Sequence, residues 1–583
     1  MTLFQPEFIA GILLVFLQLR LRYYFNLSSY LINGLTFFLP PEDELIATLN
    51  GQGIMNNKMK KTVQFSKNST TQPLSAAEKL DKFYVRVAKT ESSVFSQTLF
   101  YELYEMFIVL VSSALFGCWI GSIVKVVTLW IQFSQEQVNE KVNVATYSLL
   151  SAMFVALWFP FQLNFTHGWT SYEARLGLSV GFIGLIAAGF IILPPKGMFD
   201  FDLERAAQLT GERIAMVLRT VGFTHADFVN IAPLAEIARA ILFFAFALLA
   251  GVFTCTTFLP SFRFARMYLE MIKNKQYSIR KRLLLHLNMF FPVLICVLWV
   301  PQLFKNVVVP LELVKCSPRA LVRDCLQTEV LGLTNAASSD IWKWYSLTES
   351  QFHMLRIYVV FVACLVRLLC FRDYLQYFLL EPREVMASLV GRPGFVDGAL
   401  LQSKVRLQFN YVPVIALQYL APMCAMLTSA QLLVKQTATS LGVFNNILSV
   451  LQNVAPNLLI PASLTPEGSH AASLNVLPDP RSLPNFGGFK LGDDLSKENV
   501  TPFLRGMSEF PVLTAEFYEA ALGFLIWYLS FTMFAVSLAG LLYWRNVGTH
   551  SSADVATAVR SNKQTSKTLK NQLKGLKMHK KNK

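Results

Sequence analysis

Strongly apolar segments recur along the chain and are separated by polar connections. Nine such segments are present, and most approach the roughly 20 residues that a helix needs to cross about 30 Å of hydrocarbon. Helix is the open-chain structure that satisfies its own backbone hydrogen bonds in lipid, and the sequence lacks the alternation of membrane barrel strands. The pattern therefore predicts an all-α, polytopic transmembrane helical bundle of about nine helices. Their expected positions are 8–19, 105–130, 143–164, 174–194, 234–258, 284–304, 354–371, 409–433 and 518–543.

The first apolar segment has two interpretations. Its uninterrupted run, Phe8 to Leu19, is as short as the core of a signal peptide. However, Glu7 precedes the run and Arg20 and Arg22 follow it, whereas a cleaved signal has the opposite polarity. An uncleaved first helix is favoured, and cleavage would leave eight helices.

The charge of the connections alternates along the chain and predicts the orientation. Lys and Arg are retained on the cytosolic side of a membrane. This rule predicts an N-terminus outside, a cytosolic C-terminus and a seven-helix core over 105–433. The segments expected in the cytosol are 20–104, with its surface helices, 261–282, 372–408 and the tail 544–583. The segments expected outside are 131–142, 195–233, 305–353 and 434–517.

Composition supports a membrane protein and argues against nucleic acid as a partner. Of the 583 residues, 53% are hydrophobic and only 15% are charged, whereas about a quarter is usual for a soluble chain. The net charge of +15 comes from clusters beside apolar segments, in 263–282 and in the tail. We therefore expect the lipid bilayer, with its anionic inner leaflet at the basic tail, as the partner.

Arg367 lies several residues inside the seventh apolar segment, where an ionisable side chain is costly. The favoured interpretation is that its long stem lets the guanidinium reach the inner headgroups. The alternative is a functional ion pair within the membrane. Glu102 and Glu105, at the start of the second segment, are candidate partners on the same side.

Other polar residues near the segments have structural interpretations. Glu236 and Arg239 are three residues apart, a spacing that permits an ion pair on one helix face. His286, near the start of the sixth segment, is more simply a hydrogen-bonded packing residue than a proton switch or ligand. Gly177, Gly181 and Gly184 predict close approach of the fourth helix to a neighbour.

The connections carry further candidates. Cys316 and Cys325 share the connection 305–353 and are the two cysteines outside the apolar segments, so an oxidising side would allow a disulfide. Asn499 begins an Asn-Val-Thr glycosylation sequence in the expected outer loop. Lys580 and Lys581 resemble a dilysine signal for retrieval to the endoplasmic reticulum, or are simply the end of a lysine-rich tail.

Short amphipathic elements are expected in two connections. In 202–221, apolar residues recur at helical spacing and predict an amphipathic helix that packs on its neighbours. Pro40 and Pro41 precede Glu-Asp-Glu and predict a second, shorter helix.

Several short patterns occur in order between about residues 30 and 545. They include Leu417-Gln418-Tyr419-Leu420-Ala421-Pro422, Pro260-Ser261-Phe262-Arg263-Phe264-Ala265, Leu285-His286 and Cys364-Leu365-Val366-Arg367. In this order they resemble the transmembrane protein 161 family, although the outer loops and the basic tail are longer here. The resemblance implies a multi-pass membrane protein without an assigned catalytic reaction, which modulates membrane excitability or stress responses. It also draws attention to Arg367, Arg263, His286, Gln418 and Tyr419, which fall at matched motif positions.

Three function classes follow. The first is a non-enzymatic regulator of ionic currents that acts on a partner such as an ion channel. The second is a channel or transporter with a polar path through Arg367, Glu102, Glu105 and His286. A membrane-embedded enzyme ranks last, because the 7 histidines are scattered, and no cofactor is expected. Both the endoplasmic reticulum and the plasma membrane fit the sequence.

Overall fold

In the part of the chain that a computed structural model describes, eight helices are long and apolar enough to cross a membrane. They confirm the predicted apolar segments from the second onward. The structure describes residues 6–22, 24, 26–50, 83–84, 86–90, 92–131, 144–165, 172–192, 198–220, 231–273, 278–308, 349–390, 395–436 and 516–546. The eight helices are α6 (Tyr101–Ile131), α7 (Val144–Asn164), α8 (Tyr172–Ile192), α10 (Ile231–Lys273), α11 (Ile279–Leu298), α14 (Glu349–Leu380), α16 (Gly398–Asn410) with α17 (Val412–Gln436), and the last helix, Glu516–Asn546.

The first apolar segment forms α1 (Pro6–Arg20), a helix of 15 residues. At 1.5 Å per residue it is about 22 Å long, shorter than the hydrocarbon layer. It packs along α6, where Gln18 Nε2 donates a hydrogen bond to Ser112 Oγ over 3.1 Å. The structure thus describes eight full-length spans and one short apolar helix beside them.

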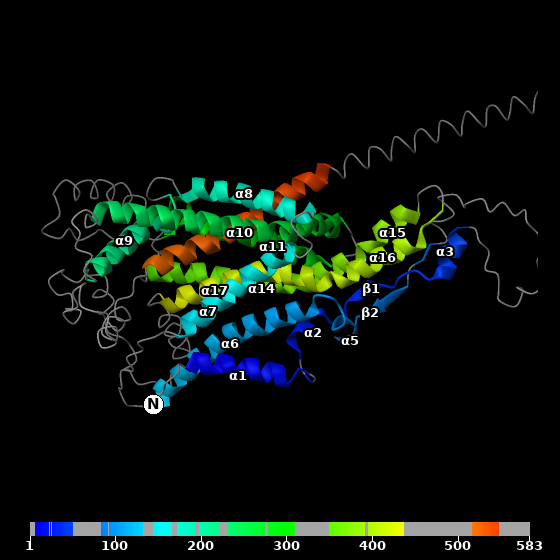
Figure 1. Ribbon diagram of the computed structural model, residues 1–583, viewed down its shortest axis with the longest axis horizontal. Helices are drawn as coiled ribbons and strands as arrows, with labels where there is room; N and C mark the ends of the chain where they lie inside the picture. Colours follow the sequence, from blue (N-terminus) through cyan, green and yellow to red (C-terminus); the bar gives the residue numbers. More distant parts are fainter. Residues whose placement is uncertain are drawn as a thin grey trace, which may run out of the picture.

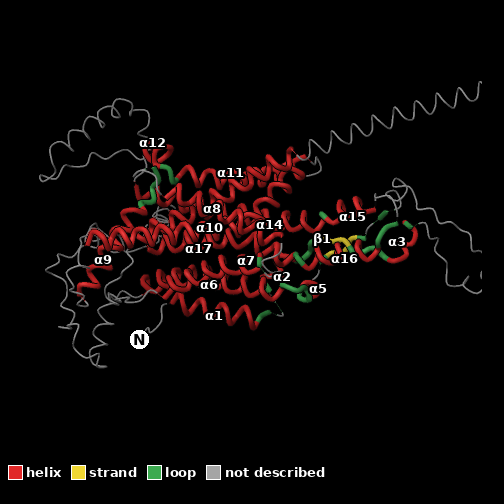
Figure 2. Tube along the Cα trace, turned by 45° about the horizontal axis from the view of Figure 1, so that its top comes forward, coloured by secondary structure: helices red, strands yellow, loops and turns green. Residues whose placement is uncertain are grey.

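The spanning helices lie side by side along the long axis of the molecule, in both views (Figures 1 and 2). α17 is the central helix, because it packs against α6, α7, α10 and α14. Every residue from 412 to 426 is buried. Helix that is apolar on all sides is typical of the centre of a bundle.

Small residues bring α8 and α10 close together, as the glycine pattern predicts. A Cβ on Gly181 would lie 3.0 Å from the carbonyl oxygen of Gly251, and a Cβ on Gly184 would lie 2.2 Å from Thr254 Oγ1. By contrast, a Cβ on Gly189 of the same helix would meet nothing within 4 Å. The absence of side chains at Gly181 and Gly184 therefore allows this helix contact.

The predicted basic loop 261–282 is largely helical, which corrects the expected boundary. α10 continues through Pro260 to Lys273, and α11 begins at Ile279. Arg266 and Glu270 form an ion pair four residues apart in this extension. Hydropathy marks where a helix leaves the hydrocarbon and not where its backbone hydrogen bonds end.

A small folded unit, which we call the cap, lies at one end of the bundle (Figure 1). It contains a pair of antiparallel strands, in which Thr36 pairs with Lys89 and Phe38 with Val87, so the all-α prediction missed this element. The expected helix after Pro41 is present as α3. The cap elements are α2 (Leu27–Ile32), β1 (Thr36–Phe38), α3 (Asp43–Leu49), β2 (Val87–Lys89), α5 (Ser92–Phe95), α15 (Pro382–Val390) and α16.

The cap joins chain segments that are far apart in the sequence. Asn50 Oδ1 accepts from the backbone N–H of Val396 over 2.6 Å, and Asn50 Nδ2 donates to the Val396 carbonyl over 3.1 Å. Gln376 on α14 bonds both backbone groups of Thr36, each over 2.9 Å. The buried cluster of the cap contains Phe38, Leu45, Leu49, Met386, Val390, Val396, Leu401 and Val405.

Segments with the same predicted sidedness meet at the same end. At the cap end, Arg266 of α10 pairs with Glu381, and its guanidinium lies 5.0 Å from the ring centroid of Trp544 in the last helix. Three segments that were predicted to be cytosolic therefore contact one another. The structure thus fixes which connections share an end, while their assignment to the cytosol stays a prediction from charge.

The opposite end gathers connections predicted to lie outside. The amphipathic helix over 202–221 is confirmed as α9 (Leu203–Thr220), which packs on α10. Arg205 of α9 lies 3.8 Å from Glu516, at the start of the last helix. Short elements, a π-helix η1 (Pro301–Lys305) and α12 (Asn306–Val308), complete this end.

Candidate functional site

The central helix places two polar residues next to each other in the middle of the bundle. Gln418 and Tyr419 of α17 are 4% and 0% exposed. Successive helix residues are rotated by about 100°, so these two side chains point to different neighbours. Each is the centre of its own group of contacts.

Gln418 connects three helices through its amide. Its Oε1 accepts from Arg263 Nη1 of α10 over 3.1 Å, and its Nε2 donates to Asn164 Oδ1 of α7 over 3.0 Å. Two of the predicted motif residues, Arg263 and Gln418, are therefore brought together. Charge-assisted bonds of this kind are stronger than bonds between neutral groups.

Tyr419 makes several contacts with α14. Its hydroxyl donates to the backbone carbonyl of Arg367 over 3.0 Å, and the Arg367 guanidinium lies 4.4 Å from its ring centroid. The ring of Tyr374 stacks on the same aromatic ring with centroids 4.5 Å apart. The positive charge of Arg367 is thus held over an aromatic face, an electrostatically favourable arrangement.

The expectation that Arg367 reaches the headgroups is wrong. Its side chain is 6% exposed. Because the Arg367 backbone is bonded to Tyr419 and the guanidinium lies on its ring, the stem is directed into the bundle. Nε and Nη2 have no hydrogen-bond partner among the residues that the structure describes.

Glu105 pairs with Arg22 and not with Arg367. Arg22 Nη2 lies 2.6 Å from Glu105 Oε2, and Asn26 Nδ2 donates to Glu105 Oε1 over 2.8 Å. Glu102, one turn earlier, is exposed. The sequence shows the depth of these carboxylates in the membrane but not the side of α6 on which they lie.

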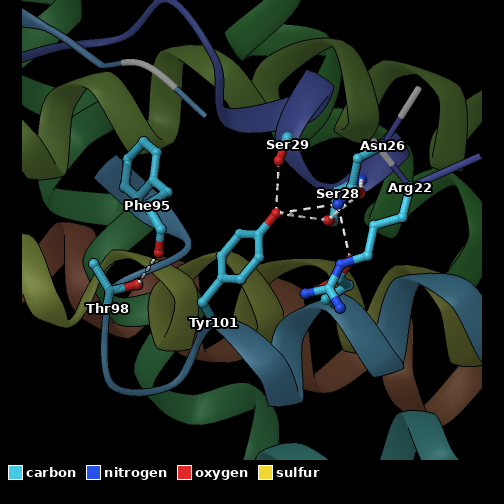
Figure 3. A network of polar contacts seen from close by, with 8 residues as sticks. Arg22, Asn26, Ser28, Ser29, Phe95, Thr98 and Tyr101 are labelled. Carbon is cyan, nitrogen blue, oxygen red and sulfur yellow. Dashed lines mark hydrogen bonds and ion pairs between the residues drawn. The ribbon is translucent and has the colours of Figure 1, made fainter. Parts of the chain in front are cut away.

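Tyr101 extends the Glu105 network toward the cap. Its hydroxyl lies 2.6 Å from Ser29 Oγ and 3.1 Å from Ser28 Oγ (Figure 3). Asn26 also caps α2, since its Oδ1 accepts from the backbone N–H of Ser28 over 3.1 Å. The network fixes α2 against the start of α6.

His286 of α11 forms one described hydrogen bond. Its Nδ1 lies 2.8 Å from the Tyr268 hydroxyl of α10, and the rings are arranged edge to face. His286 is therefore hydrogen-bonded between two helices, although its side chain is exposed. Among the residues that the structure describes, no three His, Cys, Asp or Glu side chains are grouped as a metal site.

Two motif residues that carried the sequence resemblance, Arg263 and Arg367, thus contact Gln418 and Tyr419 of α17. The comparison with protein families agrees with the resemblance. The family model described as predicted transmembrane protein 161AB matches residues 2–328 and 310–547. The chain belongs to the transmembrane protein 161 family. With eight apolar helices among its described residues, it is an integral multi-pass membrane protein. No solved structure matches this family member.

In this transmembrane protein 161 chain, Glu236 and Arg239 form the expected ion pair over 2.7 Å. Arg239 also reaches Glu204 of α9 over 3.4 Å, so the pair helps to hold α9 against α10. The other predicted sites, Cys316, Cys325, Asn499, Lys580 and Lys581, lie outside the described residues.

Sequence analysis missed a buried ionic cluster at the end opposite the cap. Arg356 of α14 is 3% exposed, and its Nη2 lies 2.5 Å from Asp200 Oδ2. Lys305 Nζ donates to Asp200 Oδ1 over 3.1 Å, and Arg356 Nε donates to the carbonyl of Leu298 over 3.0 Å. A signal was available, because Arg356 is a second arginine within the same apolar segment as Arg367.

Proposed function

We propose that this protein is a non-enzymatic membrane protein that modulates ionic currents, membrane excitability or stress responses by contact with another membrane protein, such as an ion channel. The observation that supports this function best is the burial of α17 along residues 412–426. Because α17 fills the centre of the bundle, we favour action through contact with a partner over conduction of ions along the bundle axis.

The polar groups near the centre also support a contact mechanism. Gln418 bonds side chains of two neighbouring helices, and Tyr419 bonds a third. Such bonds across helices fix the relative positions of the helices. A partner that contacts the lipid-facing surface would thereby meet a defined shape.

The membrane itself contributes to the proposed setting. The basic tail 544–583 would bind an anionic inner leaflet, and the protein would reside in the endoplasmic reticulum or the plasma membrane. A glycan on Asn499 would place the loop 434–517 on the lumenal or extracellular side. Retrieval through Lys580 and Lys581 would favour the endoplasmic reticulum.

The test compares currents with flux. Whole-cell currents are recorded in excitable cells with and without the chain, and the purified chain is reconstituted alone into liposomes for ion-flux measurements. We expect a changed current amplitude or voltage dependence in cells and no flux in liposomes. Unchanged currents after removal of the chain would contradict the proposal.

A channel or transporter is the second candidate, and one observation favours it. The chain of contacts Arg263–Gln418–Asn164 crosses the centre of the bundle close to the Arg367–Tyr419 pair. Flux from the reconstituted protein that is lost in Arg367→Ala and kept in Arg372→Ala would support this function. Arg372 is a suitable control because it lies on α14 but is exposed.

A further inference from the structure

One side of α11 is apolar and faces away from the bundle. Ile279, Leu283 and Phe290 are 82%, 58% and 55% exposed. At about 100° per residue these three side chains lie within about 40° of one another around the helix axis, so they form one stripe. The buried residues of α11, such as Leu285 and Asn288, lie on the opposite side. The stripe of Ile279, Leu283 and Phe290 therefore faces lipid.

Three cations occupy the first turn of α11 beside this stripe. Arg280, Lys281 and Arg282 follow Ile279 directly, and the turn contains no acidic residue. Lys281 is directed towards the bundle, because its Nζ lies 2.6 Å from Asp373 Oδ1 of α14. Arg280 and Arg282 are each rotated by about 100° from Lys281, in opposite directions. They therefore flank the apolar stripe, one on each side.

The first turn of a helix is an unfavourable place for cations. The N-terminus of a helix carries a partial positive charge, so cations in the first turn are repelled and an anion there is stabilised. Two carboxylates of neighbouring helices are engaged by other cations, Asp373 by Lys281 and Glu270 by Arg266 over 3.2 Å. An anion from outside the chain would therefore be stabilised by the helix and by the arginines together.

The two arginines lie at the boundary between the headgroups and the hydrocarbon. α11 has 20 residues and is about 30 Å long, which is the thickness of the hydrocarbon layer. Its first turn therefore meets the headgroups at the cap end, while Leu283 and Phe290 lie beside acyl chains. His286, one turn further in, is also exposed. Arginine binds phosphate through two parallel hydrogen bonds, which suits Arg280 and Arg282 to a phospholipid headgroup.

We propose that Arg280, Arg282 and the stripe of Ile279, Leu283 and Phe290 form a binding site for an anionic phospholipid. The headgroup phosphate contacts the guanidinium groups at the start of α11, and an acyl chain lies along the stripe. Charge complementarity supports this occupant, because the cap end is predicted to face the cytosol, where the membrane leaflet is anionic. The site is independent of the function proposed above and of the basic tail.

The test is photocrosslinking of the full-length protein in nanodiscs of phosphatidylcholine. One sample contains a small fraction of phosphatidylserine with a diazirine in its acyl chain, and the parallel sample contains phosphatidylcholine with the same group. Peptide mass spectrometry then measures the crosslinking yield on α11. We expect a several-fold higher yield from phosphatidylserine than from phosphatidylcholine at residues 279–290. Equal yields would overturn the proposal, and so would a preference that inorganic phosphate removes at constant ionic strength, which would indicate a site for free anions.

Variants distinguish this site from a general attraction of the basic protein to anionic lipid. The double variant Arg280→Gln, Arg282→Gln should lower the phosphatidylserine yield on α11 to that of phosphatidylcholine. Arg280→Gln alone changes one exposed side chain, so it is expected to fold, and it should lower the ratio of the two yields to less than about half. The matched control is Lys404→Gln, Arg406→Gln, which removes two charges at exposed positions of α16 and should keep the wild-type ratio. An unchanged ratio in both α11 variants, or an equal loss in the control, would overturn the proposal.

Discussion

Gln418 joins three helices through a single neutral amide at the centre of the bundle. Replacement by Leu removes the acceptor of Arg263 Nη1 and the donor to Asn164. Hydrogen bonds between membrane helices are individually worth about 1–2 kcal/mol at most, and a buried group left unpartnered adds a desolvation cost. Both effects act on the folded state of this variant.

We therefore predict that Gln418→Leu lowers the free energy of unfolding by about 1–3 kcal/mol. The measurement is chemical or thermal unfolding of purified protein in mild detergent. Gln302→Leu is the matched control, because Gln302 is exposed and its replacement should have little effect. Equal destabilisation by both substitutions would show that the amide contacts of Gln418 contribute little.

The buried pair Arg356–Asp200 permits a second prediction. Asp200→Asn leaves the buried guanidinium of Arg356 and the ammonium of Lys305 without their carboxylate. Removal of one partner of a buried ion pair costs about 3–5 kcal/mol, whereas replacement of both is often nearly neutral. Asp200→Asn should thus be more destabilised than the double variant Asp200→Asn, Arg356→Met.

Unfolding of the single and double variants measures this coupling. Asp202→Asn serves as the control, since Asp202 is exposed. Its Oδ1 accepts from the backbone N–H of Arg205 at the start of α9, and an Asn side chain can accept the same bond. A double variant as unstable as the sum of its single variants would mean that the two charges do not stabilise each other.

The contact between α8 and α10 leaves room for a side chain at some glycine positions of α8 and not at others. Gly184→Leu would place carbon atoms where Thr254 of α10 now lies, 2.2 Å from the new Cβ. Gly189→Leu on the same helix faces open space. We predict that Gly184→Leu separates the two helices and lowers the yield of monodisperse protein several-fold, while Gly189→Leu folds normally.

Size-exclusion chromatography of both variants, expressed in parallel, checks this prediction. Normal elution and yield of Gly184→Leu would show that the helices accommodate the added volume elsewhere.

Hydropathy predicted the spanning helices because lipid requires apolar helices of nearly fixed length. It did not predict that α10 ends at Lys273, because a helix continues beyond the hydrocarbon wherever its backbone remains bonded. The strands β1 and β2 were missed for a different reason. Each has three residues, and Thr36 depends on Gln376, far away in the sequence.

The candidate site was predicted in its residues but not in its contacts. Arg367 was identified because a charge interrupts an apolar run, and Tyr419 because it lies in a family motif. Their contact depends on the rotation of α14 and α17 about their axes, which hydropathy does not determine. For the same reason the sequence offered Glu105 as a candidate partner of Arg367, whereas the structure pairs it with Arg22.

The cap depends on contacts between distant segments, and one residue tests its cohesion. Asn50→Ala removes both hydrogen bonds to the backbone of Val396. We predict at least tenfold faster amide hydrogen exchange at residues 396–401, since a loss of about 1.4 kcal/mol corresponds to a factor of ten. Asn410→Ala, at an exposed position of α16, should leave exchange in the cap unchanged.

The whole molecule predicts a pattern of sidedness. Lys404 of α16 and Arg545 of the last helix belong to the cap end, whereas Arg205 of α9 belongs to the opposite end, and all three are exposed. Single cysteines at these positions should react with an impermeant maleimide in two groups. Position 205 should label in intact cells or sealed vesicles of outward orientation, and positions 404 and 545 only after permeabilisation.

The labelling tests two things separately, namely which positions share an end of the bundle and which end faces the cytosol. Different labelling of positions 404 and 545 would contradict the arrangement of the helices. Labelling of both in intact cells would leave that arrangement correct and reverse the assignment of the cap end to the cytosol.

The short helix α1 has a consequence for the surrounding lipid. It presents Leu13, Phe16 and Leu19, at 61%, 68% and 58% exposure, on a helix of 15 residues beside the longer α6. Acyl chains next to α1 would have to compress or tilt to match it, while those on the far side of the bundle would keep their full extension. The protein would then sit in an asymmetric annulus and accumulate where bilayers are thin or their lipids have short chains.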